Sequence, residues 1–325
     1  MKNYGKRTAL ISDKQYITYE QLARAVDAVA SIIRQSGVGK GDKVAVMLPN
    51  VPEFVYSYFG TLKLGAVVVP FNTLSTPYEL TYLLNNSDSK ILITQGTQLK
   101  KIDEIKDKLS TCHRVIPIDS MNQNGELLTG AAGQGNAVAE IHPEDPAVMI
   151  YTAGLTGRPL GAVLTHHNLY SQAVTTKSIA QRTPDDVALA LIPLFHSFGA
   201  TVNMLLVIKA GCSIVMMERL TMDSLFSAIE REKISFIAGV PRLFMGMILY
   251  EKASKYNASS IDLCITGGAP MPADFLPAFE SKFGVRLLEG YGLTEASPVC
   301  AFNRPDITCK QGSIGPAIMG VEIKI

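Results

Sequence analysis

Short apolar segments of strand length alternate with segments of helical periodicity over almost the whole chain. The first part contains the strand-like runs KVAVML, AVVVP and KILIT, with helical signals between them. After residue 186 the alternation returns with the runs VALALI, SIVMM, ISFIA, IDLCIT and VRLLE. Strands that are apolar along their whole length are typical of parallel sheets covered by helices on both faces. The pattern predicts an α/β fold of two βα-layered lobes with mostly parallel sheets.

Several helices in this pattern carry their own start and stop signals. Thr18 and Gln21 can form a capping box, and Gly37 can end the helix that they begin. The run TPYE supplies a second box that starts at Thr76, with proline at the first helical position. These signals predict one helix over about 18–37 and another that begins after Thr76.

The length of the chain suits two large lobes. It has 325 residues, of which 47% are hydrophobic, and this is enough to bury a sizeable core. We place the lobes roughly at 1–145 and 146–325, with 122–146, rich in Gly, Asn and Ala, as the linker. The most apolar stretch, Ala200 to Met217, contains Lys209 and a glycine, so we interpret it as a buried helix and strand rather than a transmembrane segment.

Charge and cysteine content exclude several classes of partner. Lys and Arg number 30 against 29 Asp and Glu, so a net charge of +1 gives no reason to expect nucleic acid or an anionic membrane. The five cysteines include no CxxC pair, and the N-terminus has no apolar signal segment. We expect a reduced, cytoplasmic setting without a transmembrane segment. Whether the chain forms a homodimer stays open.

Four loops that follow predicted strands have unusual chemistry. Ligands of open α/β sheets bind outside the carboxyl ends of the strands. The run AVMIYT leads into AGLTGRPLGAVLTHHNL, VALALI into PLFHSFG, IDLCIT into GGAP, and VRLLE into GYGLTEASP. In the first loop, Gly154, Gly157 and Gly161 suit a backbone that presents N–H groups to phosphate oxygens. That loop lacks the Walker spacing, however, so by itself an ordinary surface loop is the simpler explanation.

Each of the other loops also has a structural explanation. Thr294 can cap a helix that follows GYGL, although Tyr291 can instead form a flat wall for a base and Glu295 a ligand for Mg²⁺. GGAP can be an ordinary turn, and His196 a core histidine. Taken singly, none of these loops establishes a function.

Together and in this order, the loops resemble the adenylate-forming (AMP-binding) superfamily of acyl-CoA synthetases, aryl-CoA ligases, luciferases and peptide-synthetase adenylation domains. YTAGLTGRPLGAVLTHHNL is similar to the family's phosphate loop, Y-T-S-G-T-T-G-x-P-K-G-V-x-L-T-H-x-N, and EGYGLTE to its second signature. ITYEQL, GVGKGDKVAVMLPN, GAVVVPFNTLSTPYEL, PLFHSFG, GVP and TGGAP follow the family's order. The resemblance covers essentially all of residues 1–325 and implies the large N-terminal domain of such an enzyme.

The resemblance implies an ATP-dependent ligase that converts a carboxylic acid to an acyl adenylate and then to acyl-CoA, with Mg²⁺ as the metal. The residues implied to bind the nucleotide are Thr152, Ala153, Gly154, Leu155, Thr156, Gly157, Arg158, Gly268, Ala269, Pro270, Glu289, Gly290, Tyr291, Gly292 and Thr294. Those implied to bind the acyl substrate are His196, Phe198, Val240 and Gly292. The implied catalytic residues are Thr294, Glu295 and His196, and the implied metal ligands are Glu295 and Thr156.

The loop PLFHSFG bears on the substrate. Amino-acid-activating members of the family place an aspartate in this region to hold the substrate ammonium, whereas His196 and Ser197 stand here without a nearby acidic residue. The resemblance therefore implies a small-molecule acid that is fatty or aryl, and a fatty acid is the first expectation. Loading of a carrier protein remains an alternative.

Three positions of the phosphate loop depart from the family pattern. Ala153, Leu155 and Leu160 stand where serine, threonine and lysine are usual. Loss of a hydroxyl that meets phosphate costs on the order of 1–3 kcal/mol, and loss of the lysine charge costs a similar amount. We expect weaker ATP binding, or a loop whose leucines pack against the protein and keep it closed. A degenerate paralogue that binds acyl or nucleotide ligands without catalysis is the main alternative.

The last residues form the second departure. VEIKI reads as a strand cut in the middle, at the start of a small β subdomain. The resemblance implies that the ribose-binding aspartate, the hinge and the swinging C-terminal domain with its catalytic lysine are absent from these 325 residues. We therefore expect weak nucleotide binding and little or no turnover from this chain alone.

Overall fold

The computed structural model describes the chain as two compact units. The described residues are 4–13, 15–121, 139–154, 157–217, 220–310 and 312–324. Unit 1 comprises Met1–Arg7 and Ile17–Leu169, and unit 2 comprises Thr8–Tyr16 and Tyr170–Ile325. The lobe boundary therefore lies after Leu169 rather than near residue 145, because the segment from 146 to 165 adds two strands to the sheet of unit 1. Most of the expected linker lies outside the described residues.

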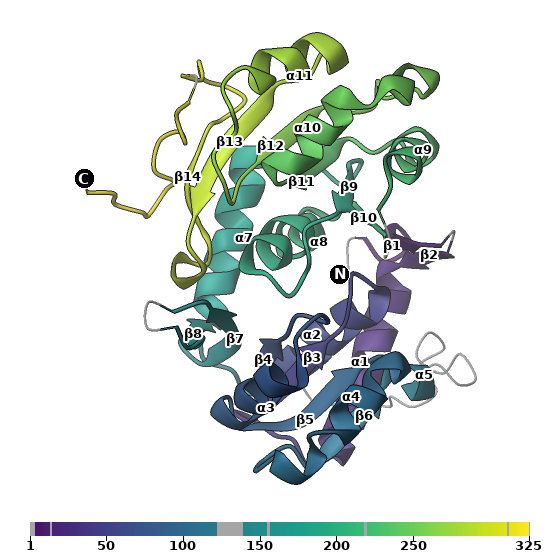
Figure 1. Ribbon diagram of the computed structural model, residues 1–325, viewed down its shortest axis with the longest axis vertical. Coiled ribbons are helices and arrows are strands. Elements are labelled where there is room, and N and C mark those ends of the chain that lie inside the picture. The colour runs from purple at the N-terminus through teal and green to yellow at the C-terminus, as the bar shows by residue number, and fades with distance from the viewer. Residues whose placement is uncertain are drawn as a thin grey trace. The chain divides into compact units, whose positions relative to one another are not determined.

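Unit 1 is built on a six-stranded sheet of order β6-β5-β3-β4-β7-β8 among its described residues (Figure 1). Its strands are β3 (Lys43–Met47), β4 (Val67–Pro70), β5 (Ser89–Thr94), β6 (Arg114–Pro117), β7 (Pro146–Thr152) and β8 (Leu160–Thr165). Its helices are α1 (Tyr19–Gln35), α2 (Pro52–Lys63), α3 (Pro77–Asn86), α4 (Leu99–Asp103) and α5 (Ile118–Met121). All neighbouring strands are parallel except β7 and β8, which form an antiparallel hairpin.

Local sequence signals explain where the helices of unit 1 begin. Both predicted capping boxes are present: Thr18 with Gln21 at the start of α1, and Thr76 with Glu79 at the start of α3. Each box satisfies backbone N–H groups that have no partner within the helix. Gly60 lets α1 and α2 pack closely, because a Cβ atom there would lie 3.1 Å from the backbone nitrogen of Ala30.

In the part of unit 2 that the structure describes, the second sheet has eight strands in the order β14-β13-β12-β11-β9-β10-β1-β2 (Figure 1). The strands are β1 (Thr8–Ser12), β2 (Gln15–Thr18), β9 (Val187–Ala190), β10 (Ser213–Met216), β11 (Phe236–Gly239), β12 (Leu263–Thr266), β13 (Leu287–Gly292) and β14 (Val299–Phe302). The helices of unit 2 are α7 (His166–Ala180), which begins in unit 1, α8 (Leu206–Ala210), α9 (Met222–Glu232), α10 (Pro241–Leu249) and α11 (Phe275–Phe283). From β13 to β1 the strands are parallel, and β14 is antiparallel to β13.

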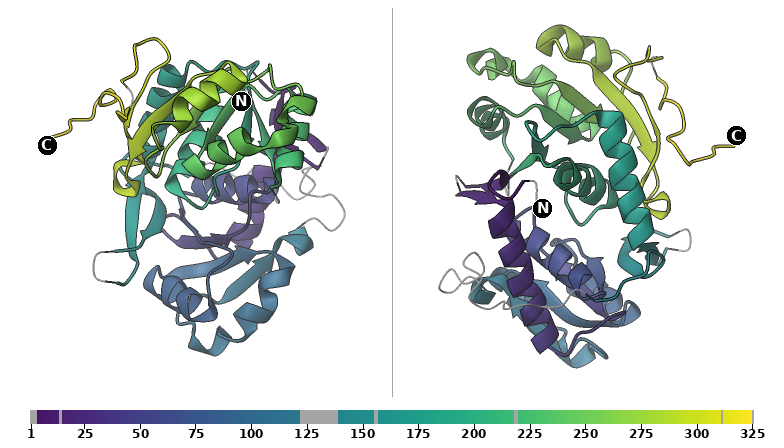
Figure 2. Two further views of the ribbon diagram at one scale, coloured as in Figure 1. Left: turned by 45° about the horizontal axis from the view of Figure 1, so that its top comes forward. Right: turned by 180° about the vertical axis from the view of Figure 1, so that it is seen from behind.

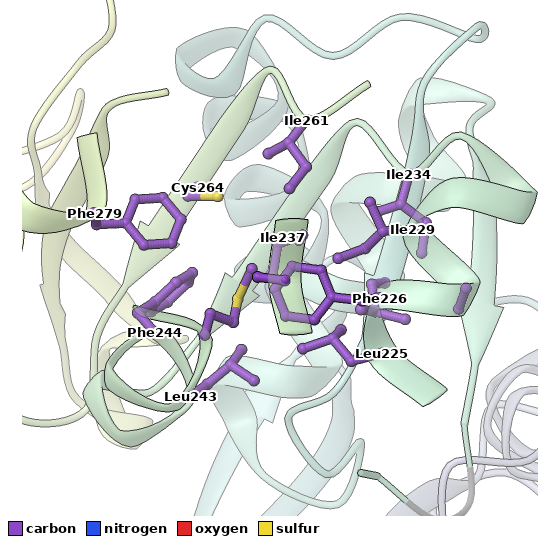
Figure 3. Packing of buried hydrophobic residues seen from close by; sticks show 14 of the residues in the cluster. Leu225, Phe226, Ile229, Ile234, Ile237, Leu243, Phe244, Ile261, Cys264 and Phe279 are labelled. Carbon is purple, nitrogen blue, oxygen red and sulfur yellow. The ribbon is translucent and has the colours of Figure 1, made fainter. Parts of the chain in front are cut away.

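Helices cover both faces of the second sheet, as predicted. On one face, α9, α10 and α11 pack against the strands, and Figure 3 shows their apolar side chains meeting those of β11 and β12. Phe226, Phe244 and Phe279 are fully buried there, and the rings of Phe244 and Phe279 meet edge to face at 5.4 Å between centroids. Helix α7 lies on the opposite face (Figures 1 and 2). The predicted α/β class with two mostly parallel, helix-covered sheets is confirmed.

Three expectations for unit 2 need correction. The buried helix expected at the start of the stretch Ala200 to Met217 begins as a π-helix, η3 (Gly199–Leu205), that continues into α8. The strand predicted to end at Glu289 continues to Gly292, because β14 pairs with its last residues. The expected strand at VEIKI is absent from residues 321–324, and the only bridge in the described part after β14 joins Ala301 to Ala317.

Two global expectations can be compared with the described residues. None of their helices has the length and apolarity needed to cross a bilayer. All five cysteines are free thiols. Burial raises the pKa of the Cys112 thiol to about 11 and that of Cys212 to about 12, so neither is a ready thiolate.

Candidate active site

The sheet order of unit 2 brings three of the four predicted loops, together with the loop of Val240, to one edge. Strands β13, β12, β11 and β9 are consecutive neighbours and run parallel, so their carboxyl ends share an edge. The loops that leave this edge carry His196, Val240, Gly268 and, after β13, Thr294. This is where ligands bind in open α/β sheets. Residues from four separate sequence segments therefore lie together in unit 2.

Two of the residues expected on the acyl side, Phe198 and Val240, lie close to the backbone of the GGAP loop. A Cβ atom on Gly267 would lie 3.3 Å from the ring of Phe198, and one on Gly268 would lie 3.8 Å from Cγ1 of Val240. Gly268 has a φ of +81°, in the region that favours glycine. Val240 is 43% exposed at the N-terminus of α10. Phe198, Val240 and the GGAP loop thus form the apolar part of the candidate site.

The hydrogen bond of His196 fixes its tautomer. The backbone N–H of Phe198 donates to Nδ1 of His196 at 3.2 Å, so Nδ1 is an acceptor and carries no proton. Partial desolvation of the ring lowers the pKa of His196, although the residue as a whole is exposed. A neutral imidazole of this tautomer offers Nε2–H as a donor. A substrate carboxylate is a matching acceptor.

A side-chain hydrogen bond joins the loop after β9 to the loop after β13. Oγ of Ser197 lies 3.0 Å from Oγ1 of Thr294, and Ser197 is 2% exposed. The helix start proposed for Thr294 is wrong: Leu293 occupies the cap position of a short 3₁₀ turn, Thr294–Ala296, without a side-chain cap. The Thr294 hydroxyl pairs with Ser197 across the site.

Glu289 positions the GGAP loop. Its Oε1 accepts a hydrogen bond from the backbone N–H of Met271 at 3.2 Å, directly after Pro270. The carbonyl of Glu289 accepts from both the backbone N–H and the side-chain amide of Asn303. The side chain of Glu289 therefore holds the segment that carries Gly268, Ala269 and Pro270, all three of which are exposed.

The end of β13 presents backbone and an aromatic ring to solvent. Tyr291 is 44% exposed in the strand, between Gly290 and Gly292. A Cβ atom on Gly292 would lie 2.3 Å from the carbonyl oxygen of Pro298, so only glycine fits there. Tyr291 is free to stack on a planar group, as expected for a base.

The predicted phosphate loop belongs to unit 1, where it connects the antiparallel strands β7 and β8. Thr152 ends β7 and pairs with Leu160, the first residue of β8. Gly154 has a φ of +66°, and a Cβ atom there would lie 2.2 Å from the carbonyl oxygen of Arg158. Gly157 has a φ of +80°. The glycines are needed for the turn itself.

The substituted positions of this loop can be described in part. Leu160 is 57% exposed, and Ala153 is exposed as well. Leu155 and Thr156 lie outside the described residues, so the second expected magnesium ligand and one of the two leucines are not placed. The exposure of Leu160 contradicts the alternative in which this side chain packs against the protein.

The donor set fits a magnesium ion bound mainly through phosphate. The described residues contain no group of three or more His, Cys, Asp or Glu side chains that could hold a metal. Mg²⁺ is commonly held by one or two carboxylates together with substrate phosphates and water. The exposed carboxylate of Glu295, next to Thr294, suits that arrangement.

Comparison with known proteins decides the family. The profile of the family described as AMP-binding enzyme matches residues 1–325. The chain belongs to the AMP-binding enzyme family. It is 30% identical to 4-coumarate–CoA ligase 3 of Oryza sativa subsp. japonica over 349 residues, which covers 100% of this chain and 61% of that protein. It is also 30% identical over 344 residues to a long-chain-fatty-acid–CoA ligase of Bacillus subtilis (strain 168), covering 96% and 61%. The chain thus spans less than two thirds of both relatives.

Solved structures of AMP-binding enzymes share the fold. The anthranilate CoA ligase AuaEII, solved in complex with anthranoyl-AMP, superposes with a TM-score of 0.91 at 26% identity, covering 98% of this chain and 62% of that one. The inhibitor-bound N-terminal domain of FACL13 from Mycobacterium tuberculosis gives 0.90 at 29% identity, covering 98% and 80%. The predicted membership of the family and the match to an N-terminal domain are confirmed.

Two residues near the site were not found by sequence analysis. Gln172 of α7 and Thr201 of η3 both donate hydrogen bonds to the loop after Thr294. Neither lies in a loop after a strand or in a family signature. The one available signal was polarity inside apolar surroundings, since Thr201 lies in a segment predicted to be buried.

Proposed function

We propose that the chain is the nucleotide- and acyl-binding part of an ATP-dependent acid–thiol ligase. The observation that carries the proposal is the hydrogen bond between Ser197 and Thr294. It couples the loop of His196, on the acyl side, to the loop of Thr294 and Glu295, on the phosphate side. The reaction requires the carboxylate of the acid and the α-phosphate of ATP to meet at one place.

In the first step, a carboxylate oxygen attacks the α-phosphorus and forms a new O–P bond. The bond from the α-phosphorus to the oxygen that bridges to the β-phosphate breaks, and pyrophosphate leaves with its electron pair. His196 would donate Nε2–H to the carboxylate and orient it. When Ser197 donates to Thr294, the Thr294 proton is free to point at a phosphate oxygen. Mg²⁺ held by Glu295 and phosphate would neutralise charge when bound. In the second step, the thiol of coenzyme A displaces AMP from the acyl carbon.

The acyl side favours an acid with an apolar body. Phe198 and Val240 line it, and no acidic residue in PLFHSFG offers a partner for an ammonium group. We propose a fatty acid first and an aryl acid second. The relatives named above act on 4-coumarate and on long-chain fatty acids according to their names, and the chemistry of the loop suits both classes.

The test is direct binding. We expect calorimetry with ATP and Mg²⁺ to detect weak binding to this chain, and AMP release to be negligible from the chain by itself. A protein in which this chain is joined to a C-terminal domain of the family should release AMP and form acyl-CoA with a member of a fatty and aryl acid panel. Absence of AMP release across that panel contradicts the proposal. If the acyl group is transferred to a phosphopantetheinyl carrier protein and not to coenzyme A, the carrier protein is the acyl acceptor.

A second candidate is a non-catalytic acyl-binding protein. The apolar residues Ala153 and Leu160 in the phosphate loop favour it. In that case the same calorimetry shows binding of a fatty acid and none of ATP with Mg²⁺.

A further inference from the structure

The loop after β13 folds back on itself in a conformation that needs support. The backbone N–H of Leu293 donates to the carbonyl of Pro298 at 2.8 Å, and that of Ser297 donates to the carbonyl of Thr294 at 3.1 Å. Ser297 has a φ of +82°, which residues with a side chain rarely adopt, and it is 5% exposed. Such a conformation persists only where the surrounding structure imposes it. The contacts of the loop should therefore include groups that impose it.

Gln172 of α7 contacts the loop on both sides of Ser297. Its Nε2 donates to the carbonyl of Ala296 at 3.3 Å and to the carbonyl of Val299 at 3.0 Å. Gln172 is 8% exposed. The two acceptors fix the orientation of the amide, because a turned amide would place Oε1 against two carbonyl oxygens. Both hydrogens of one side-chain amide are thus used to bridge the turn.

Thr201 of η3 contacts the turn between these two points. Its Oγ1 donates to the carbonyl of Ser297 at 3.3 Å, and Thr201 is 2% exposed. The residue lies in a π-helix, a geometry that is rare in proteins overall but occurs often at functional sites. Side chains from two helical elements therefore hold three carbonyls of one loop, and the same loop carries Thr294 and Glu295.

We propose that Gln172 and Thr201 are positioning residues that hold the loop 293–299, so that Thr294 and Glu295 face the phosphates of the nucleotide. They act through the backbone of the loop and do not touch the nucleotide. The role at the phosphates rests on the proposed function, whereas the support of the loop is a property of unit 2 by itself. If these residues only satisfied buried carbonyls, their loss would lower global stability without a local effect.

The consequence for ligand binding is specific. A magnesium ion shared by Glu295 and phosphate requires the carboxylate at one position, so a loosened loop raises the Mg²⁺ concentration needed for ATP binding. Binding contributed by other parts of the protein would not depend on Mg²⁺ in this way. A shift in Mg²⁺ dependence thus separates positioning from a merely structural role.

The test uses Gln172→Leu and Thr201→Val, each of which removes the donor. Thr201→Ser retains a hydroxyl, and Gln172→Glu keeps the size if Gln172→Leu does not fold. Thr175→Val is the matched control, since Thr175 is equally buried on α7. Hydrogen exchange of the backbone amides of residues 293–297 and 299 is measured without nucleotide, together with thermal unfolding. ATP binding by calorimetry is then measured over a range of Mg²⁺ concentrations.

We expect about tenfold faster exchange at the amides of Ala296 and Ser297 in both donor-deletion variants, with exchange in unit 1 unchanged. The Mg²⁺ concentration for half-maximal ATP binding should rise by a similar factor. Thr201→Ser and Thr175→Val should behave as the unmodified chain does.

Three outcomes overturn the inference. The first is an unchanged exchange rate of the loop amides in the donor-deletion variants. The second is an increase in that rate that Thr175→Val reproduces. The third is faster exchange of the loop amides while the Mg²⁺ dependence of ATP binding stays the same. If the unmodified chain binds no nucleotide, the proposed function fails, and the exchange data alone decide whether Gln172 and Thr201 hold the loop.

Discussion

At the scale of single residues, the site combines groups whose protonation and polarity are set by a few contacts. The pKa of His196 is lowered by partial desolvation, and Phe198 holds its Nδ1 as an acceptor. In the phosphate loop, by contrast, the position of Leu160 has lost a charge: an exposed apolar side chain stands where the family carries a lysine. Each of these residues leads to a prediction about charge.

The first prediction concerns His196 and pH. Because the folded-state pKa lies below the ordinary value, the unfolded chain binds more protons in the interval between the two values. Stability is therefore lost as the pH falls through the ordinary histidine pKa towards the lower pKa of the folded state. His166 adds a pH dependence of stability with the same sign, because burial lowers its pKa too. His196→Gln should reduce the loss of thermal stability between about pH 7.5 and about pH 5.5.

The matched control for this prediction is His167→Gln, which removes an exposed histidine from the first turn of α7. Thermal unfolding at a series of pH values checks both variants. A His196→Gln protein with the same pH dependence as the unmodified chain would show that His196 does not titrate as stated.

The second prediction concerns Leu160. Leu160→Lys restores a cation at a position that is 57% exposed, so the side chain fits without repacking. A charged donor that reaches phosphate should tighten ATP–Mg²⁺ binding about tenfold. Val163→Lys places the same charge three residues later on β8, on the other face of the strand, and should leave the affinity unchanged. Equal gains from both variants would indicate a general charge effect.

At the scale of elements, helix ends and strand runs were predictable, and the exceptions occur where two elements meet. The capping boxes at Thr18 and Thr76 involve residues three apart in sequence, so local chemistry is enough to predict them. The extension of β13 to Gly292 depends on pairing with β14, which no local signal contains. For the same reason, no local signal could predict that the Thr294 hydroxyl pairs with Ser197 and does not cap a helix.

The start of η3 yields a prediction at this scale. Gly199 lies against the preceding turn, where a Cβ atom would be 2.2 Å from the carbonyl oxygen of Pro193. Gly199→Ala should therefore lower the free energy of unfolding by about 1–3 kcal/mol. Gly246→Ala provides a control of opposite sign, because that helical glycine in α10 has room for a methyl group, 3.5 Å from Met222.

Denaturant unfolding checks both variants. Gly246→Ala should raise the free energy of unfolding by about 0.5–1 kcal/mol, since alanine has the higher helix propensity. A stable Gly199→Ala protein would mean that the turn before η3 can move to accept the methyl group.

At the scale of the whole molecule, the first strand ties the beginning of the sequence to unit 2. Strand β1 pairs with β10, with Leu10 opposite Ile214, although the helix that follows belongs to unit 1. The two units are therefore each discontinuous in sequence, which a boundary search along the chain could not reveal. The boundary expected near residue 145 differs from the observed one for a separate reason, because the segment from 146 to 165 adds two strands to the sheet of unit 1.

This arrangement predicts where a core mutation acts. Leu10 is fully buried, so Leu10→Ala should cost about 2–5 kcal/mol of stability. The loss should appear as faster hydrogen exchange in β9 and β10 of unit 2. Leu92→Ala, an equally buried change in β5, should instead accelerate exchange in β3 and β5 of unit 1. Faster exchange of β3 and β5 in Leu10→Ala would contradict the assignment of β1.

The sequence by itself determined the α/β class, most helices and strands, and the family, because these depend on periodicity and on residues close together in the chain. It also identified the loops of His196, Gly268 and Thr294 as the places to search. Only the tertiary structure decided how those loops interact: Ser197 with Thr294, Glu289 with Met271, and Gln172 with the turn at Ser297. These contacts join residues distant in sequence, and they form only when the order of the strands brings the loops to one edge of the sheet.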